Sequence, residues 1–182
     1  MIRASLLVLA SVCALTAQTM PVIAEQKAAY TSLKNNIIKA AEKMPEDAYA
    51  FKATEDVRSF GQIIGHVADA QYLFCSTASG EKNPGLNIEK TKTAKADLVA
   101  ALKDGFAYCD KVYDSMTDAA SSQMVNFFGN NASKFAVLQL NVGHNMEHYG
   151  NLVTYMRIKG VVPPTSEQQG AMPASKPDTP KK

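Results

Sequence analysis

The chain has 182 residues, 46% of them hydrophobic and 20% charged, so it is long and apolar enough to bury one proper core. Its 19 basic and 17 acidic residues give a formal net charge of +2. No dense basic block or aromatic-basic interleaving is present, which argues against nucleic acid as a partner.

The first 24 residues have the pattern of a secretory signal peptide. Arg3 precedes a short apolar run of small residues at positions 4–17, and we expect cleavage after Ala24, with Ala17 as the alternative. Because the run is too short for a stable transmembrane helix, we expect an exported protein, periplasmic or secreted, with no stable membrane span after cleavage. Two other interpretations are a lipoprotein anchored through Cys13 and an N-terminal extension of the first helix.

Helical periodicity predicts a first helix over about residues 25–43. Pro45 ends it, because the residue before a proline is pushed out of helical geometry. A second helix is predicted to begin near Thr54, a plausible N-cap, and to stop near Gly80.

A loop around Pro84 leads to a third helix, predicted over about residues 93–116. Residues 117–132 look irregular. Either Asn131 or Ser133 could cap a fourth helix, which we expect to continue to Ile158.

No segment shows sustained strand-like alternation, so the predicted fold class is all-α, a four-helix bundle over residues 25–162. Residues 163–182 are rich in proline, serine, glutamine and lysine and lack apolar periodicity. They are predicted to form a disordered tail.

All three histidines of the chain occupy positions from which they could bind one metal ion. His144 and His148 are four residues apart on the fourth predicted helix, so both imidazoles lie on one face. His66, on the second predicted helix, would complete a three-nitrogen site with open coordination positions, as catalytic metal sites usually have.

Polar side chains share these helix faces and are candidates to orient the ligands or a bound water. They are Gln62 and Asp69 around His66, and Asn141, Asn151 and Tyr155 around the histidine pair, with Glu147 on its flank.

The segment from His144 to His148 also matches the H-x-x-E-H pattern of inverted zinc proteases, with Glu147 as the base. That interpretation needs a further ligand from a distant downstream acid. Only 34 residues follow His148, most of them in the predicted tail, which disfavours a protease.

Two segments together resemble the DinB family of metal-binding four-helix bundles. They are MPEDAYAFK followed by VRSFGQIIGH, within residues 44–66, and HNMEHYGNLVTYMRIKGVVPP, residues 144–164. The resemblance implies an up-down-down-up topology and a divalent metal, usually zinc or nickel, held by His66, His144 and His148.

Removal of the signal peptide would leave two cysteines, Cys75 and Cys109. Export makes a disulfide possible, and an even number of cysteines is compatible with one. The alternative is that both cysteines are buried thiols. In the implied topology the second and third helices run parallel, which puts the two cysteines at similar heights. A bridge between them would stabilise the fold by about 3–4 kcal/mol.

Three neutral imidazoles leave the charge of a metal uncompensated, so that it would acidify a water or a substrate thiol. The predicted function is therefore a metal-dependent transferase or hydrolase acting through a metal-bound thiolate or hydroxide on an unknown small molecule. The resemblance implies thiol chemistry, whereas export fits hydrolysis better, because small thiols belong to the reducing cytoplasm. A non-catalytic metal-binding module and a structural helical protein are the alternatives, and a homodimer is one option for the oligomeric state.

Overall fold

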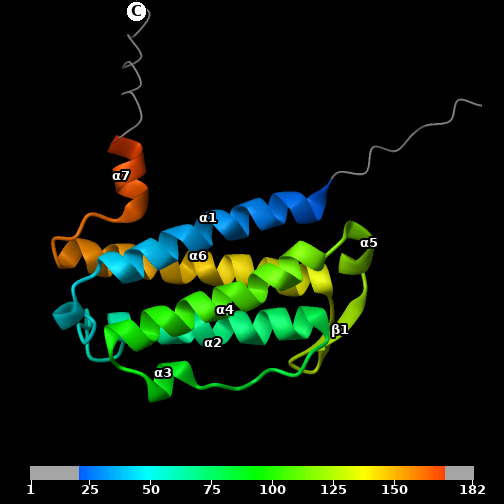
Figure 1. Ribbon diagram of the computed structural model, residues 1–182, viewed down its shortest axis with the longest axis horizontal. Coiled ribbons are helices and arrows are strands. Elements are labelled where there is room, and N and C mark those ends of the chain that lie inside the picture. Colours follow the sequence, from blue (N-terminus) through cyan, green and yellow to red (C-terminus); the bar gives the residue numbers. More distant parts are fainter. Residues whose placement is uncertain (1–20, 171–182) are drawn as a thin grey trace, which may run out of the picture.

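Four long helices form one bundle in the computed structural model, which describes residues 21–170 (Figure 1). They are α1 (Val22–Lys43), α2 (Phe60–Ser79), α4 (Lys95–Ser115) and α6 (Lys134–Ile158). Helices α1 and α6 run in one direction and α2 and α4 in the other (Figure 1). The predicted all-α bundle with up-down-down-up topology is confirmed.

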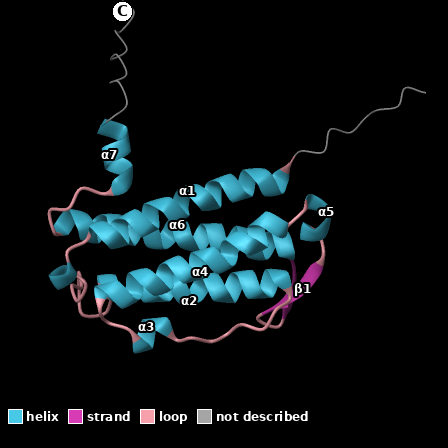
Figure 2. Cartoon of the chain, viewed as in Figure 1, coloured by secondary structure: helices cyan, strands magenta, loops and turns pink. Residues whose placement is uncertain are grey.

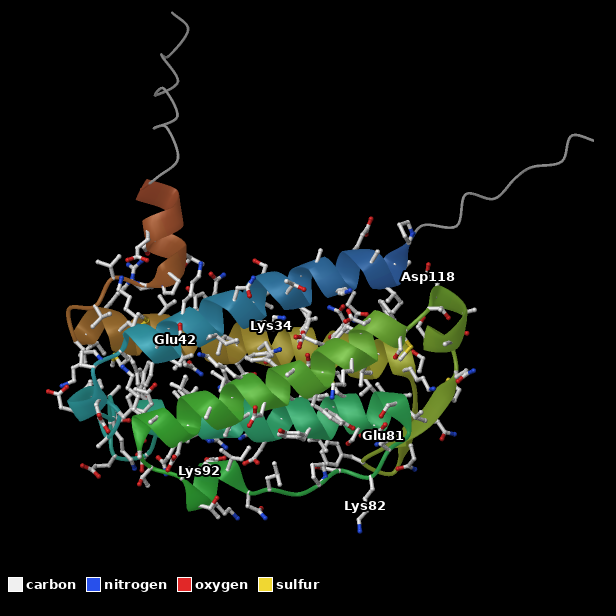
Figure 3. All side chains as sticks on the ribbon, in the orientation of Figure 1. Lys34, Glu42, Glu81, Lys82, Lys92 and Asp118 are labelled. Atoms are coloured by element: carbon white, nitrogen blue, oxygen red, sulfur yellow. A yellow bond between two sulfur atoms is a disulfide. The ribbon has the colours of Figure 1, made fainter. Side chains whose placement is uncertain are left out.

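The beginning of α1 is anchored to a segment far away in the sequence. The Ile23 side chain is buried, and its backbone N–H donates to the Asp118 carboxylate at 2.9 Å, beside the start of α1 (Figure 3). Cleavage after Ala24 would remove this anchor, whereas cleavage after Ala17 would keep it. Residues 1–20, which hold most of the predicted signal peptide, lie outside the described residues.

Helix α2 begins at Phe60, six residues later than the predicted cap at Thr54. Ser59 is the N-cap: its hydroxyl accepts from the Gln62 N–H at 3.2 Å, and the Gln62 side chain accepts from the Ser59 N–H at 2.8 Å. This reciprocal capping box satisfies two helix-end donors at once, which a lone threonine cap cannot do. A short 3-10 helix, Glu46–Ala48, lies in the segment between α1 and α2.

A long connection returns along α2 and brings α4 parallel to it (Figure 1). It contains the short helix α3 (Ile88–Thr91), which packs so closely on α2 that a Cβ atom on Gly65 would lie 2.7 Å from the Glu89 Cα. Glycine at this position therefore permits the close approach. Helix α4 matches the third predicted helix within two residues.

Cys75 on α2 and Cys109 on α4 form a disulfide with a Cα–Cα distance of 5.3 Å. Both residues are fully buried, so the bond lies inside the bundle. The parallel direction of the two helices brings these positions to the same height.

The prediction that residues 117–132 are irregular is wrong. This segment contains α5 (Asp118–Ser121) and a hairpin of β1 (Met124–Phe127) and β2 (Asn130–Ser133), drawn in magenta in Figure 2. The two turn residues have positive φ, 51° at Phe128 and 81° at Gly129, as the tightest hairpin turns require. Strands of four residues are too short to show alternation in sequence. Ser133, one of the two predicted caps, then caps α6 by accepting from the Ala136 N–H at 3.1 Å.

The first part of the predicted disordered tail is also ordered. Helix α7 (Pro164–Gly170) is held to α1 by an ion pair between Lys43 and Glu167, and to α6 by a 3.1 Å hydrogen bond from Tyr149 to the Thr165 hydroxyl. These contacts depend on tertiary neighbours, which explains why periodicity gave no sign of them. Residues 171–182 lie outside the described residues.

Over residues 21–170, none of the helices is both long and apolar enough to cross a membrane. Aromatic and aliphatic side chains from all four long helices form the buried core, as in the stacked pair Tyr30 and Tyr113, whose ring centroids are 4.1 Å apart.

Candidate metal centre

The bundle brings His66 of α2 together with His144 and His148 of α6. One nitrogen from each ring lies within 4.8 Å of the others. The Nε2 atoms of His66 and His144 are 3.0 Å apart, and the ring centroids of His144 and His148 are 4.4 Å apart. Three nitrogens this close together could share one metal ion after small side-chain adjustments.

Burial keeps two of these imidazoles neutral. Desolvation, with smaller contributions from the neighbouring histidines, lowers the pKa of His144 to about 3. Desolvation also lowers the pKa of His148, whose side chain is 6% exposed. Since the neutral ring is the form that binds a metal, the pair needs no deprotonation at neutral pH.

Two nitrogens at this centre have no partner among the described residues. They are the Nδ1 atoms of His144 and His148, both buried. An unpaired buried polar atom costs free energy unless a ligand or solvent satisfies it. The donor set and its neutrality fit a divalent ion.

Glu89 of α3 fixes the orientation of His66. Its Oε2 atom lies 3.0 Å from His66 Nδ1, and its Oε1 atom accepts from Arg58 Nε at 2.8 Å. Burial alone would raise the pKa of Glu89, but the hydrogen bond and charge of Arg58, together with His66, hold it below its usual value. An ionised carboxylate can only accept, so His66 Nδ1 donates and its Nε2 lone pair is left for a metal.

Two predicted site residues, Asp69 and Tyr155, bond to neighbours of the histidines and not to the histidines themselves. The Asp69 carboxylate accepts from the backbone N–H groups of Ile88 and Glu89 at 2.8 and 3.0 Å, and so places α3 against α2. The Tyr155 hydroxyl donates to the Arg58 carbonyl at 2.8 Å. Both therefore position the Arg58–Glu89 pair, rather than contact the histidines as expected.

Three other predicted residues make no hydrogen bond to a histidine in the described part of the chain. Gln62 is engaged in the capping box of α2, and Asn151 and Glu147 are exposed on α6. The charge of Glu147 only moderates the lowering of the His148 pKa. Its exposure gives no support to a role as the base of an inverted protease motif.

Asn141 belongs to a buried ring of three amides. Its Nδ2 donates to Gln71 Oε1 at 3.0 Å, Gln71 Nε2 donates to Asn145 Oδ1 at 2.8 Å, and Asn145 Nδ2 donates back to Asn141 Oδ1 at 3.3 Å. All three side chains are fully buried. Each amide needs the others, so the ring fixes the rotation of α6 on α2 that turns His144 and His148 toward His66.

An open cavity of about 510 Å³ lies beside the histidines, and His66 and His144 form part of its wall. The rest of the wall comes from α2, the connection through α3 and the tip of the hairpin. A small molecule in this cavity could therefore reach the two rings.

Comparison with known proteins identifies the family. The profile of the DinB superfamily matches residues 29–152, which include all three histidines. The chain belongs to the DinB superfamily. It is 26% identical over 135 residues to the uncharacterized protein YjoA of Bacillus subtilis (strain 168), an alignment that covers 72% of this chain and 86% of YjoA.

Solved structures of DinB-like proteins have the same fold. The crystal structure of Bacillus subtilis YjoA matches with a TM-score of 0.62 at 25% identity, covering 75% of this chain and 92% of that one. A DinB-like protein from Bacillus cereus ATCC 10987 matches with a TM-score of 0.69 at 16% identity, covering 80% and 98%. A mycothiol-dependent maleylpyruvate isomerase matches with a TM-score of 0.59 at 15% identity, covering 71% and 60%.

In this DinB-superfamily chain, Glu89 bonds directly to His66 but was not among the predicted site residues. Glu89 lies in the connection between two helices, where no periodicity relates it to His66. A weak signal was present: Asp69 lies on the same helix face as His66, and an acid at that position can cap a short helix packed alongside.

Proposed function

We propose that this DinB-superfamily protein is a metalloenzyme that binds one divalent ion, zinc or nickel, through His66, His144 and His148. Supporting this, the three rings lie within reach of one ion, and burial lowers the pKa values of His144 and His148. A tri-histidine donor set leaves the charge of the ion uncompensated, and a bound ion would then acidify a water or a thiol.

The cavity beside the rings is the observation that favours catalysis over simple metal storage. A closed metal site has all its coordination positions filled by the protein, whereas His66 and His144 face an open space of about 510 Å³. The chain's own residues would bind the substrate there and hold the ligand ring of His66 through Glu89.

Hydrolysis of a small molecule is the reaction class that we propose. The buried Cys75–Cys109 disulfide suits an oxidising compartment, and we propose that the protein is exported. Small-thiol cofactors are scarce in such a compartment, which favours water as the nucleophile. Thiol-dependent transfer is the second candidate, because a protein of the same fold is a mycothiol-dependent isomerase.

Elemental analysis of untagged protein, followed by ester and thiol-transfer assays, tests this function. We expect about one equivalent of zinc or nickel per chain and a chelator-sensitive esterase activity. His144→Ala should lose both metal and activity, whereas Asn151→Ala, an exposed change on the same helix, should lose neither.

Two results would contradict parts of the proposal. If a folded His144→Ala variant retained all of its metal, this would contradict a metal site that includes His144. Stoichiometric metal without activity on any ester or thiol substrate, and without an exchangeable water on the ion, would favour the non-catalytic module instead.

A further inference from the structure

We propose that the cavity beside the histidines binds a small amphipathic carboxylate, with its anionic end at Lys90 of α3 and an apolar body under the tip of the hairpin. This inference rests on the proposed function, since it names the substrate class of that same site. It follows from the distribution of polar and apolar residues along the cavity wall.

The cavity follows α2 from His66 to Phe74. Eight residues of helix correspond to a length of about 12 Å. Helix α3 packs against α2 at the His66 end, where the backbone of Glu89 approaches Gly65. The hairpin contacts the other end, because the ring centroids of Phe74 and Phe127 are 5.7 Å apart.

The hairpin end of the cavity is apolar. Its lining there includes Leu73 and Phe74 of α2 and Phe128 at the hairpin turn, and Leu86 of the connection also lines the cavity. Phe128 is 74% exposed and Leu86 is 49% exposed, so both side chains leave apolar surface in water, which is unfavourable. A ligand with an apolar body would bury part of both.

The α3 end carries one uncompensated positive charge. The two acids that line the cavity are already engaged, since Asp69 accepts two backbone N–H groups and Glu89 accepts from Arg58 and pairs with His66. Lys90 lines the cavity as well, and no ion pair or hydrogen bond of its ammonium group is found within residues 21–170. A single ammonium group attracts a single anionic group.

Together these features define the ligand. The cavity volume of about 510 Å³ suits a molecule of metabolite size, and its length suits an extended one. One free cation at one end selects a monoanion over a polyanion, and the apolar end disfavours a sugar. A substrate of this class would keep its free carboxylate at Lys90 and carry a separate ester or amide bond, which His66 and His144 in the same cavity wall could reach.

Isothermal titration of the full chain with 4-phenylbutyrate and its neutral analogue 4-phenylbutyramide tests this inference. We expect the carboxylate to bind the metal-free protein about fivefold tighter than the amide does, as one partly exposed charge pair allows. Lys90→Gln should reduce this preference to less than about twofold, and Phe128→Ser should weaken both ligands by several-fold.

Lys92→Gln is the matched control. Lys92 lies two residues from Lys90, beside the start of α4 (Figure 3), and lines a separate cavity of about 620 Å³ on the other side of α3, which Lys90 also borders. Because Lys92 does not line the cavity beside the histidines, its replacement should leave both affinities unchanged.

Three outcomes would overturn the inference: equal affinities for acid and amide, a preference that survives in Lys90→Gln, or a preference lost in Lys92→Gln. Failure of the proposed function would look different, because wild-type protein would then retain no zinc while the Lys90-dependent preference persisted in the metal-free form.

Discussion

Glu89 is the residue on which the geometry of His66 depends most. Its carboxylate is held by Arg58 on one side and by His66 on the other, with distances of 2.8 and 3.0 Å. A carboxylate behind a ligand imidazole fixes its tautomer and makes the free nitrogen more basic. Glu89 would therefore prepare His66 to bind a metal.

Replacing Glu89 should weaken metal binding more than it weakens the fold. We expect Glu89→Ala to lower zinc affinity by about 10- to 100-fold in competition with a chelator of known affinity, because His66 loses its fixed tautomer. Glu81→Ala, in the same connection (Figure 3), is the control, since Glu81 bonds Tyr108 and not a histidine. Equal affinities for the two variants would show that Glu89 has no positioning role.

His144 should make the stability of the metal-free protein depend on pH. Its folded pKa of about 3 lies below the ordinary value of 6.5. Above pH 6.5, His144 is neutral in both the folded and the unfolded chain. Between pH 6.5 and about 3, the unfolded chain binds a proton at this residue and the folded chain does not. Stability should therefore fall between pH 6.5 and 3, with a slope of at most about 1.4 kcal/mol per pH unit from this group.

Urea denaturation of the metal-free protein at several pH values measures this effect. His144→Gln removes the titrating group, so its unfolding free energy should fall less steeply over the same range. Identical slopes for the wild type and His144→Gln would mean that His144 is protonated as easily in the fold as in the unfolded chain.

At the scale of elements, the disulfide joins the two parallel helices whose connection carries Glu89. Cys75 and Cys109 are separated by 34 positions in sequence. A closed loop of that length reduces the entropy of the unfolded chain by an amount worth about 3–4 kcal/mol. The bond therefore also limits how far α2 and α4 can separate.

The double variant Cys75→Ala/Cys109→Ala should lower the unfolding free energy in urea by at least about 3 kcal/mol, from the lost crosslink and the lost buried sulfur atoms. Thiol titration of the unreduced, denatured wild type checks the bond itself. Two free thiols there would contradict the disulfide.

The elements that the sequence predicted well are those whose stability comes from a long apolar face. Helices α1, α4 and α6 begin or end within a few residues of the expected positions, because periodicity over about 20 residues is a strong signal. The start of α2, the hairpin and α7 were missed. Each is defined by a few specific contacts, such as the Ser59–Gln62 capping box or the Lys43–Glu167 ion pair.

For the molecule as a whole, the histidines that come together could be predicted but their surroundings could not. The four-residue spacing of His144 and His148 puts them on one face in any helix. By contrast, the roles of Asp69, Asn141 and Tyr155 depend on which helix packs beside which. The sequence predicts only the helix face on which each of these residues lies. In the folded bundle, Asn141 belongs to the buried amide ring, and the Tyr155 hydroxyl donates to the Arg58 carbonyl.

A metal at this centre would bridge α2 and α6, so its binding should stabilise the whole bundle. At a free zinc concentration about 100 times the dissociation constant, the gain is about 2.7 kcal/mol. For a chain of this size it corresponds to a rise in Tm of roughly 5–10 °C in a thermal melt. His148→Ala should remove the dependence on zinc, and an equal rise in that variant would contradict binding at the three histidines.

X-ray absorption at the edge of the retained metal counts the ligands of the ion and so shows whether His66, His144 and His148 bind it. We expect three imidazole nitrogens at about 2.0–2.1 Å from the ion, with oxygen or nitrogen atoms completing its coordination shell. Loss of this imidazole signal in a folded His66→Ala variant would support the assignment. Sulfur ligands at about 2.3 Å, or a shell without imidazole scattering, would contradict a site built from His66, His144 and His148.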